Sequence, residues 1–500
     1  METIIYHQMK YTFFFILGIL LGCFPIKANQ IVSPWRSCPS IVQAGDYMEI
    51  LYDNIYEMPI DSVILEGPFN RVMLPVESVS IGRFEYDSFL SSVTNNKIQV
   101  KIPEDTPEEL YNLVIKSAGE THISKKSVKV LKEYRNPHSF IHISDLHVSR
   151  QWVGSVDNGY AKELELLDKF IEVANIIHPD YIIVTGDLIH DYTRFNADST
   201  GWKGTVVSGW EHRPLAEEKY KNLFEGANGF SGIYGFNAPV FSLPGNHDFY
   251  GMGKDDYRGK VAQWNRLMGK RVYGFSYADT RIIASDDFLG DPITDIPDKA
   301  PMSGLQGALL EQFFIDAGHG KLRIMAQHRH NRVDTDFINK HQINILLNGH
   351  SHTPKVNHIG TTPTLSVRSG VVCRSGEIIN WEKRLGFFRI FYIDGNNFHY
   401  SPPLRFCKNP TAPYEELIMN LSLVYKKENN GTQTTNEALI TNDLDMDLPN
   451  CRIRFVMKKG KYKVSEGTIY QVIKTPEYSV LDIDIDIAAS DRKSIKVSKL

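Results

Sequence analysis

Five short apolar runs in the middle of the chain are each followed at once by side chains that can bind a cation or transfer a proton. The runs are FIHIS, YIIVT, FSLP, RIMAQ and INILLN, and the residues after them include Asp145 and His147, Asp187, Asn246 to Asp248, His328 and His330, and His350 and His352. Helical stretches such as ELELLDKFIEVANII and LQGALLEQFFIDA separate the runs, and this alternation is typical of a layered α/β domain. Ligands bind at the carboxyl ends of strands in such domains, so we expect these side chains to meet at one edge of a sheet.

The residue types in these segments suit divalent transition metals. Two carboxylates, one amide oxygen and four imidazoles fill two neighbouring sites if one carboxylate is shared, and nitrogen and oxygen donors without thiolate favour Mn, Fe, Zn or Co. Two such ions, about 3.5–4 Å apart, clamp a phosphoryl group and generate hydroxide at neutral pH. With two carboxylates and one hydroxide they keep about one positive charge, which favours a phosphate oxyanion. A single segment of this kind is common in proteins and usually has only a structural role, whereas five such segments in this order predict a metal-binding site.

The ordered segments DLH, GD, GNHD, H and GHSH resemble the motifs of the calcineurin-like metallophosphoesterase superfamily, over about residues 137–405. The resemblance implies an α/β fold of two mixed sheets flanked by helices. It also implies an enzyme that hydrolyses a phosphate ester with hydroxide held by a dinuclear metal centre. Monoester and diester substrates both stay open, because the superfamily includes enzymes for each. The D-x-H form of the first segment is widespread among its phosphodiesterases, which slightly favours a diester.

The resemblance implies a role for each residue of these segments. One metal ion would be held by Asp145, His147, Asp187 and His352, and the other by Asp187, Asn246, His328 and His350. His247 would protonate the leaving alkoxide, with Asp248 orienting its ring, and imidazole suits this task because its pKa lies near the working pH. On an extended backbone His350 and His352 would lie on one face, and Gly349 would let the chain turn closely around the site.

Neighbouring positions leave the ligand set open or limit it. His330 is an alternative to His328, which we favour because the family usually uses the first imidazole after the strand. Purple acid phosphatases have glycine in place of His147 and tyrosine in place of His190, so their iron site is not expected here. His190 and Asp191 follow the shared aspartate and belong either to a shell around the ligands or to a plain surface loop.

Two arginines are candidate substrate contacts. Arg213 lies in the long segment between Asp187 and Asn246, and loops beside a metal centre often build the substrate pocket. A guanidinium there could bind a phosphate through two hydrogen bonds. Arg329 directly follows His328, and for both arginines an ordinary ion pair is the alternative. The expected substrate is a small-molecule or lipid phosphate ester.

The two flanks of this region read as β structure. Five hundred residues exceed one ordinary core, so several domains are expected. Residues 31–135 contain short apolar runs separated by turn residues about every ten positions, which predicts an immunoglobulin-like β sandwich. Residues 406–500 include the alternating run VLDIDIDI and predict a second β domain. These domains would wall the active site or tether the enzyme.

Residues 1–28 have the pattern of a secretory signal peptide. Lys10 precedes the apolar run YTFFFILGILLGCF, which is too short to span a bilayer, and PIKANQ follows. Two outcomes are open: cleavage after Ala28, or attachment of a lipid to Cys23 in LLGC, which resembles a bacterial lipoprotein box. Either predicts an exported protein, located in the periplasm, outside the cell or anchored at its surface.

Composition excludes some classes of protein. Lysine and arginine number 55 against 59 aspartates and glutamates, a net charge of −4, so nucleic acid is not an expected partner and a nuclease is disfavoured. Apart from Cys23, the four cysteines have no C-x-x-C spacing, which excludes the usual thiolate metal site and leaves disulfide pairing open. The alternative function is a surface binding or adhesion protein with a relic phosphoesterase domain. Metal content separates the two, and the sequence leaves the oligomeric state open.

Overall fold

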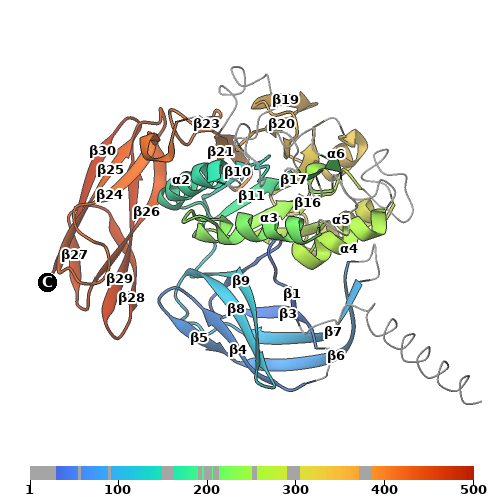
Figure 1. The fold of residues 1–500 in the computed structure, drawn as a ribbon, viewed down its shortest axis with the longest axis horizontal. Helices are drawn as coiled ribbons and strands as arrows, with labels where there is room; N and C mark the ends of the chain where they lie inside the picture. The colour runs from blue at the N-terminus through green and yellow to red at the C-terminus, as the bar shows by residue number, and fades with distance from the viewer. Residues whose placement is uncertain are drawn as a thin grey trace, which may run out of the picture.

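The computed structural model describes residues 30–54, 58–87, 92–148, 161–189, 194–195, 205–206, 213–249, 256–289, 304–330, 332–370, 386–410 and 412–500. Two strand-rich regions pack against a central α/β region, the N-terminal one (blue) beneath it and the C-terminal one (orange to red) to its left in Figure 1. The predicted signal peptide, with Cys23 and Ala28, lies outside the described residues. Within the described ranges, no helix has the length and apolar character needed to cross a membrane.

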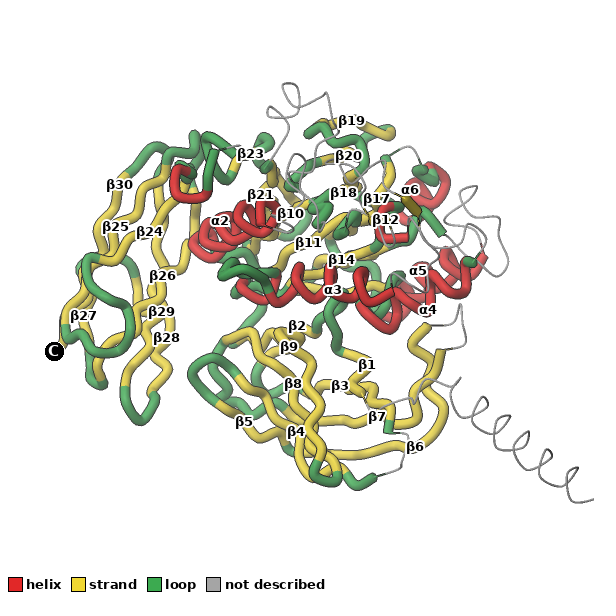
Figure 2. Tube along the Cα trace, in the orientation of Figure 1, coloured by secondary structure: helices red, strands yellow, loops and turns green. Residues whose placement is uncertain are grey.

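Two mixed sheets form the centre of the molecule (Figure 2). The first has the order β14 (Val240–Leu243), β11 (Tyr181–Thr185), β10 (His138–Ile143), β21 (Phe387–Asp394) and β22 (Asn397–Tyr400), with β23 (Leu404–Arg405) also on β21. The second has the order β15 (Tyr273–Tyr277), β16 (Thr280–Ala284), β17 (Leu322–Arg329), β18 (Ile345–Gly349), β20 (Thr362–Ser366) and β19 (Lys355–Ile359). Strands β10, β11 and β14 are parallel, and so are β16, β17, β18 and β20. The expected pair of mixed sheets is confirmed.

Side chains that alternate along these strands bury both faces of each sheet. Phe140 of β10 and Ile324 of β17 belong to one apolar core that fills the space between the sheets. Their neighbours Ile141 and Met325 point the opposite way, into the cores beneath the helices. Successive side chains of a strand face opposite sides, so strands buried on both faces read as continuous apolar runs. This is why the five runs are so apolar.

Helices cover the outer faces of the two sheets. They are α2 (Ala161–Ile177), α3 (Arg213–Glu225), α4 (Tyr257–Leu267), α5 (Gly304–Asp316) and α6 (Thr335–His341). Apart from these helices, β12 (Arg194–Phe195) and β13 (Thr205–Val206) pair as a short antiparallel ribbon. Helix α2 packs on the first sheet through side chains such as Phe170. Helices α5 and α6 pack on the second sheet through Phe314 and Phe337. Helix α6 begins where the Asp334 carboxylate accepts a hydrogen bond from the backbone N–H of Phe337.

The N-terminal region consists of two sheets that share one core. One sheet has the order β1 (Gln30–Ser33), β3 (Tyr47–Asp53), β7 (Ser92–Lys101), β6 (Val76–Asp87), and the other has β2 (Ser40–Gln43), β9 (Glu120–Leu131), β8 (Glu109–Ser117), β4 (Ile60–Glu66), β5 (Arg71–Leu74). Ile50 and Ile98 of the first sheet and Leu113 and Val130 of the second belong to the same buried cluster. The strand-rich region is present as expected, while its immunoglobulin-like character and its limits stay predictions.

The C-terminal region also has two sheets, and its core continues into the central region. The sheets have the orders β24 (Leu421–Tyr425), β25 (Thr435–Asn442), β30 (Arg492–Lys499), β27 (Tyr462–Val464) and β26 (Leu448–Lys458), β29 (Tyr478–Ile487), β28 (Thr468–Lys474). Phe455 and Ile483 of this region lie in one buried apolar cluster with Phe170 and Ile177 of α2. Buried cysteine Cys451 carries a free thiol. The predicted C-terminal β domain therefore shares its apolar core with helix α2 of the central α/β region.

All three regions meet at a buried group of charged side chains. Glu108, just before β8, accepts hydrogen bonds from the Arg452 guanidinium at 2.8 Å and from the Tyr470 hydroxyl at 2.7 Å. Arg135, between β9 and β10, lies 3.5 Å from the Glu108 carboxylate and 3.4 Å from that of Asp180. Because these residues belong to different regions, the ion pairs join the three regions directly.

Candidate metal centre

The side chains predicted to act together lie at or just after the carboxyl ends of five strands. Strands β10, β11, β14, β17 and β18 end immediately before, or within, the segments that carry Asp145, Asp187, Asn246, His328 and His350. The first four of these side chains are buried, with at most 2% of their surface exposed, and His350 is partly exposed. The parallel order within each sheet places the carboxyl ends of β10, β11 and β14 in the first sheet and of β17 and β18 in the second, so the side chains meet at the carboxyl ends of two sheets where one sheet was expected.

The first group of side chains surrounds Asp145. The Nε2 atom of His352 lies 3.2 Å from Oδ1 of Asp145 and 3.1 Å from Nε2 of His147. Nε2 of His147 lies 3.6 Å from Oδ2 of Asp187. One potential ligand atom from each of these four residues lies within 4.8 Å of the others. Such a group of two carboxylates and two imidazoles could hold a transition-metal ion.

The second group shares Asp187 with the first. Nε2 of His328 lies 3.1 Å from Oδ2 of Asp187, and the His328 and His350 rings are 5.3 Å apart between centroids. Ligand atoms of these three residues also lie within 4.8 Å of one another. Asp187 therefore occupies the position expected of a carboxylate shared by two ions. The alternative ligand, His330, is exposed and belongs to neither group.

Three buried atoms in this region fit the presence of a cation. Oδ1 of Asn246 has no hydrogen-bond partner among the described residues, and Oδ2 of Asp187 and Nε2 of His328 face each other at 3.1 Å without the geometry of a hydrogen bond. Most buried polar side-chain atoms do have a partner, and each exception needs an explanation. A metal ion accepts electron pairs from these three kinds of donor atom, so the residues present fit the metal that the motifs imply.

Hydrogen bonds to the backbone orient the His328 ring. Its Nδ1 atom lies 2.7 Å from the carbonyl oxygen of Thr185, which also accepts a hydrogen bond from the Ser144 hydroxyl. The Asp287 carboxylate accepts a hydrogen bond from the backbone N–H of His328 at 3.1 Å. A proton on Nδ1 leaves the lone pair of Nε2 facing Asp187, which is the arrangement that metal-binding histidines use.

The pKa values of the histidines depend on burial and on the two aspartates. Burial lowers the pKa of His147 to about 3 and that of His350 to about 4, so both rings are neutral near pH 7. Burial opposes charge on His328 as well, but the Asp187 and Asp145 carboxylates outweigh it and raise the pKa of His328 to about 10. The two carboxylates thus attract positive charge, which a divalent ion supplies more fully than a proton.

The backbone around the site is unusual. Asp145, His147, Asp187, His350 and His352 all have φ between 50° and 63°. Positive φ is uncommon for residues other than glycine, and it is found repeatedly at functional sites. The expectation that the last two histidines share one face of an extended strand is therefore wrong, because β18 ends at Gly349 and the chain turns at each histidine.

Gly349 has the close approach that the sequence suggests. A Cβ atom at this position would lie 2.4 Å from Oδ2 of Asp145 and 2.0 Å from the Ser144 hydroxyl oxygen. Any side chain at position 349 would therefore overlap the Asp145 carboxylate. The backbone N–H of the next residue, His350, donates to both carboxylate oxygens of Asp145 at 3.1 Å.

The candidate proton donor His247 lies beside the first group. It begins the short 3-10 helix η2 (His247–Phe249), its ring centroid is 4.7 Å from that of His147, and its backbone N–H donates to Oδ1 of Asp187 at 2.8 Å. The Asp248 carboxylate accepts hydrogen bonds from the backbone N–H groups of Gly245 at 2.7 Å and Leu188 at 3.1 Å and from the Tyr220 hydroxyl at 3.0 Å. Asp248 thus ties together the loops that carry Asn246 and Asp187, and its expected role in orienting the His247 ring stays a prediction.

The other predicted residues are placed less directly. Arg329 is buried, and its guanidinium pairs with Asp287 at 3.1 Å and stacks on Phe288, so it is held by protein groups. Arg213 begins helix α3, but its side chain lies outside the described residues. His190 and Asp191 also lie outside them.

One part of the site was missed from sequence. Asp286 and Asp287 follow β16, in the sequence RIIASDD, where they repeat the pattern of an apolar strand followed by carboxylates. Asp286 pairs with buried Arg271 at 2.7 Å, and Asp287 binds the backbone of His328 and Arg329. Asp287 thus positions the end of β17, which carries His328, and the strand pattern could have revealed both carboxylates.

Residues 138–354 match the family model described as calcineurin-like phosphoesterase. They form a calcineurin-like phosphoesterase domain. All seven proposed metal ligands and both candidate catalytic residues, from Asp145 to His352, fall within the match. The resemblance seen in the sequence is confirmed. The first sheet of the domain extends beyond the match, because β21 pairs with β10.

Solved structures with likeness to this phosphoesterase domain are distant in sequence. A predicted phosphoesterase from Streptococcus pneumoniae TIGR4 is 14% identical, with 53% of this chain and 88% of that chain covered and a TM-score of 0.23. The phosphopantetheinyl hydrolase of Mycobacterium tuberculosis is 12% identical, with 49% and 92% covered and a TM-score of 0.27. GAP50, the anchor in the inner membrane complex of Plasmodium, is 11% identical, with 53% and 84% covered and a TM-score of 0.31. No curated protein matches the chain. Because the TM-scores are low, the family assignment rests on the family model.

Proposed function

We propose that the chain is a metal-dependent hydrolase of phosphate esters that uses two divalent ions and prefers diesters slightly to monoesters. The observation that supports this most strongly is the pair of aspartate and histidine groups that share the buried carboxylate of Asp187. One shared carboxylate between two donor groups is the arrangement that a two-ion site requires. The D-x-H form of the first segment supports the preference for diesters.

In this proposal most of the site residues bind the two metal ions, and two further groups hold one of these ligands in place. Asp145, His147, Asp187 and His352 hold one ion, and Asp187, Asn246, His328 and His350 hold the other. Two divalent ions of the Mn, Fe, Zn or Co type would polarise the phosphoryl oxygens and lower the pKa of a water molecule that attacks phosphorus. Asp287 and the Thr185 carbonyl keep the His328 ring in place.

His247 supplies the proton for the leaving alkoxide oxygen. Its backbone bond to Asp187 fixes the start of η2 next to the shared carboxylate, and its ring lies perpendicular to that of His147. An imidazole can give a proton near neutral pH, which an ordinary lysine does less readily. Asp248 fixes the backbone on which His247 stands.

Metal analysis combined with two assays tests the proposal. Purified chain, loaded with Mn or Zn, is expected to hold about two ions and to hydrolyse bis(4-nitrophenyl) phosphate, a diester, at least as fast as 4-nitrophenyl phosphate, a monoester. His352→Ala should lose turnover and keep the fold, as judged by circular dichroism. A chain that binds no transition metal would contradict the proposal and favour the binding-protein alternative. Turnover like wild type in His352→Ala would contradict the ligand set.

Export is a separate part of the proposal. The apolar run after Lys10, followed by LLGC with Cys23, supports targeting to the cell exterior. Expression of the full chain and of Cys23→Ser in a bacterium, followed by fractionation, tests it. Membrane association that Cys23→Ser abolishes supports the lipid anchor; an N-terminus that begins after Ala28 supports simple cleavage. Retention of the intact chain in the cytoplasm contradicts export.

A further inference from the structure

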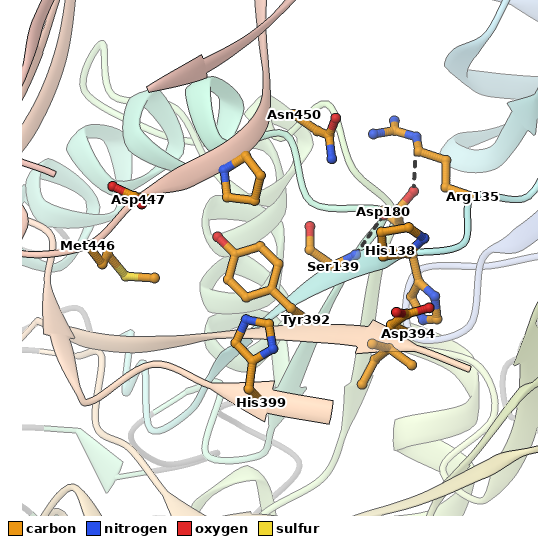
Figure 3. Close-up of a pocket in the computed structure, with 13 residues that line it drawn as sticks. Arg135, His138, Ser139, Asp180, Tyr392, Asp394, His399, Met446, Asp447 and Asn450 are labelled. Carbon is orange, nitrogen blue, oxygen red and sulfur yellow. Dashed lines mark hydrogen bonds and ion pairs between the residues drawn. The ribbon is translucent and has the colours of Figure 1, made fainter. Parts of the chain in front are cut away.

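A cavity of about 390 Å³ lies where the phosphoesterase domain meets the C-terminal region (Figure 3). It is lined by the start of β10, the β21–β22 hairpin and the segment of residues 446–450 at the start of β26. His138, which lines it, begins β10, whereas Asp145 of the metal centre follows the end of β10. The cavity and the metal centre therefore lie at opposite edges of the same sheet.

The walls of the cavity can receive an apolar or planar group. The Tyr392 and His399 rings stack with their centroids 4.8 Å apart and an angle of 18° between planes. Met446 and Pro449 add apolar surface on the side of the C-terminal region, and Figure 3 shows Tyr392 between His399 and that region. The volume falls in the range of sites that bind small organic molecules, about 300–1,000 Å³.

Two polar atoms at the cavity have no described partner. The Tyr392 hydroxyl oxygen and Nδ1 of His138 are buried, and neither has a hydrogen bond among the described residues; His138 as a whole is 4% exposed. Burial, and then the charges of Cys451 and Asp447, raise the pKa of Tyr392, so its hydroxyl keeps its proton. Buried polar groups usually have partners, and a ligand in the cavity would supply them.

The charges around the cavity are unbalanced. Asp180, Asp394 and Asp447 line it together with the single guanidinium of Arg135, which pairs with Asp180 at 3.4 Å. Asp394 and Asp447 are exposed and have no salt bridge within the described ranges, although Asp447 accepts a hydrogen bond from the backbone N–H of Ala489. Two carboxylates therefore remain to attract a cation at the rim.

We propose that this cavity binds a small organic amine, with an apolar or aromatic body on Tyr392 and Met446 and an ammonium group facing one of the two rim carboxylates, Asp447 or Asp394, which lie on opposite sides of Tyr392 (Figure 3). The apolar walls favour the body through burial of its surface. The ammonium group is favoured by the carboxylate that it faces and by the electron-rich face of the tyrosine ring. The Tyr392 hydroxyl or His138 can satisfy a polar substituent on the body.

A pair of probes that differ only in charge tests the proposal. Phenethylammonium and the neutral 2-phenylethanol are titrated separately into the full chain by isothermal titration calorimetry at low ionic strength. The ammonium probe is expected to saturate one site and to bind at least about tenfold more tightly than the neutral probe, a difference of about 1.4 kcal/mol. Equal affinity for the two probes, or no saturable binding of the ammonium probe at 10 mM (roughly the weakest affinity such fragments show), would overturn the proposal.

Substitutions locate the bound probe. The double variant Asp394→Asn with Asp447→Asn keeps the size of both side chains and the oxygen that accepts from Ala489, and it is expected to weaken phenethylammonium binding at least about tenfold. Asp445→Asn is the matched control, because Asp445 is an exposed carboxylate two residues from Asp447 that does not line the cavity. Unchanged affinity in the double variant, with its melting temperature maintained, would also overturn the proposal.

Discussion

The two ends of the central parallel strands both bury carboxylates, but they balance them in different ways. At the carboxyl edge, the described ion pairs of Asp145 and Asp187 are all with histidines. At the amino edge, Glu108 and Asp180 pair with the guanidinium groups of Arg452 and Arg135. A guanidinium is permanently charged, whereas an imidazole buried like that of His147 is neutral. The amino edge therefore carries permanent positive charge, whereas the positive charge at the carboxyl edge depends on a proton, as on His328, or on a metal ion.

This difference separates structural from functional carboxylates without reference to motifs. A buried carboxylate that accepts from arginine is satisfied within the fold, and its loss affects stability. The described ion pairs of buried Asp187 are with imidazoles, which are not permanently charged. Such a group fits a cation that arrives after folding. Strand β11 carries one carboxylate of each kind, Asp180 before it and Asp187 after it.

Substitution of these two aspartates gives the largest expected contrast. Asp187→Asn removes the charge shared by both groups, so phosphodiester turnover should fall by about 10³-fold or more, because each ion contributes several kcal/mol to the transition state. Asp180→Asn, on the same strand, should leave kcat/KM of the folded protein close to wild type and lower only its stability. Steady-state kinetics on metal-loaded protein measure both. Similar losses of activity in the two variants would break the comparison.

The amino edge should respond in stability. Glu108→Ala leaves the Arg452 guanidinium with one carboxylate fewer in a buried junction, so the free energy of unfolding should fall by about 3 kcal/mol. Urea denaturation of the wild type and the variant measures it. Glu311→Ala is the control, because its pair with Lys340 is exposed and should contribute little. A Glu108→Ala variant as stable as the control would show that the junction does not join the regions.

Substitution of one glycine at each edge tests the same comparison with smaller expected effects. In Gly349→Ala the new methyl group would displace Asp145, and turnover should fall about 10–100-fold, the range for disturbed support of metal ligands. Gly395→Ala, in the β21–β22 turn near the amino edge, meets no atom within 4 Å but has φ of +60°, so only about 1 kcal/mol of stability should be lost. Kinetics and thermal unfolding of both variants test this; reduced turnover in Gly395→Ala would contradict it.

Acid gives the smallest effect. Burial would raise the pKa of Glu108, but Lys129, Arg452 and Arg135 lower it to about 2, below its ordinary value. Its contribution to stability is therefore complete above pH 5 and is lost as the pH falls toward 2. Between pH 6 and pH 4 the loss should be about 0.8 kcal/mol. The difference in unfolding free energy between wild type and Glu108→Gln, measured at both pH values, should shrink by this amount; a constant difference would contradict the assignment.

The site could be predicted from sequence because its residues directly follow strands. Asp145, Asp187 and His328 need only the parallel order of their strands to meet, and apolar periodicity reveals strands. The turn at His350 and His352 could not be predicted, because positive φ in a residue other than glycine has no local signal. Asp287 follows the same strand rule, and its role became visible only through its bonds to the backbone of residue 328.

The sequence patterns predicted the strands of the flanking regions but not how these regions pack against one another. Strand patterns gave the β character of both flanks. Glu108 pairs with Arg452, which lies 344 residues later in the chain. A contact over that separation depends on how the folded regions pack together, and local sequence patterns do not reveal it. The same holds for the cavity at Tyr392 and Asp447, whose walls come from two regions. Charge alone cannot identify such partners in a chain with 55 basic and 59 acidic residues.

The shared core of α2 and the C-terminal sheets has a consequence for how the protein is made. Ile177 at the end of α2 precedes Leu421 at the start of β24 by 244 residues. At about 5–20 residues per second, a ribosome needs roughly 10–50 seconds to deliver the strands that cover this helix. During that interval the side of α2 that later packs on β24 and β26 stays exposed to water and to other nascent chains. The chain therefore completes this core only after its last strands have been synthesised, and until then α2 presents unburied apolar surface of the kind that makes folding intermediates prone to aggregate.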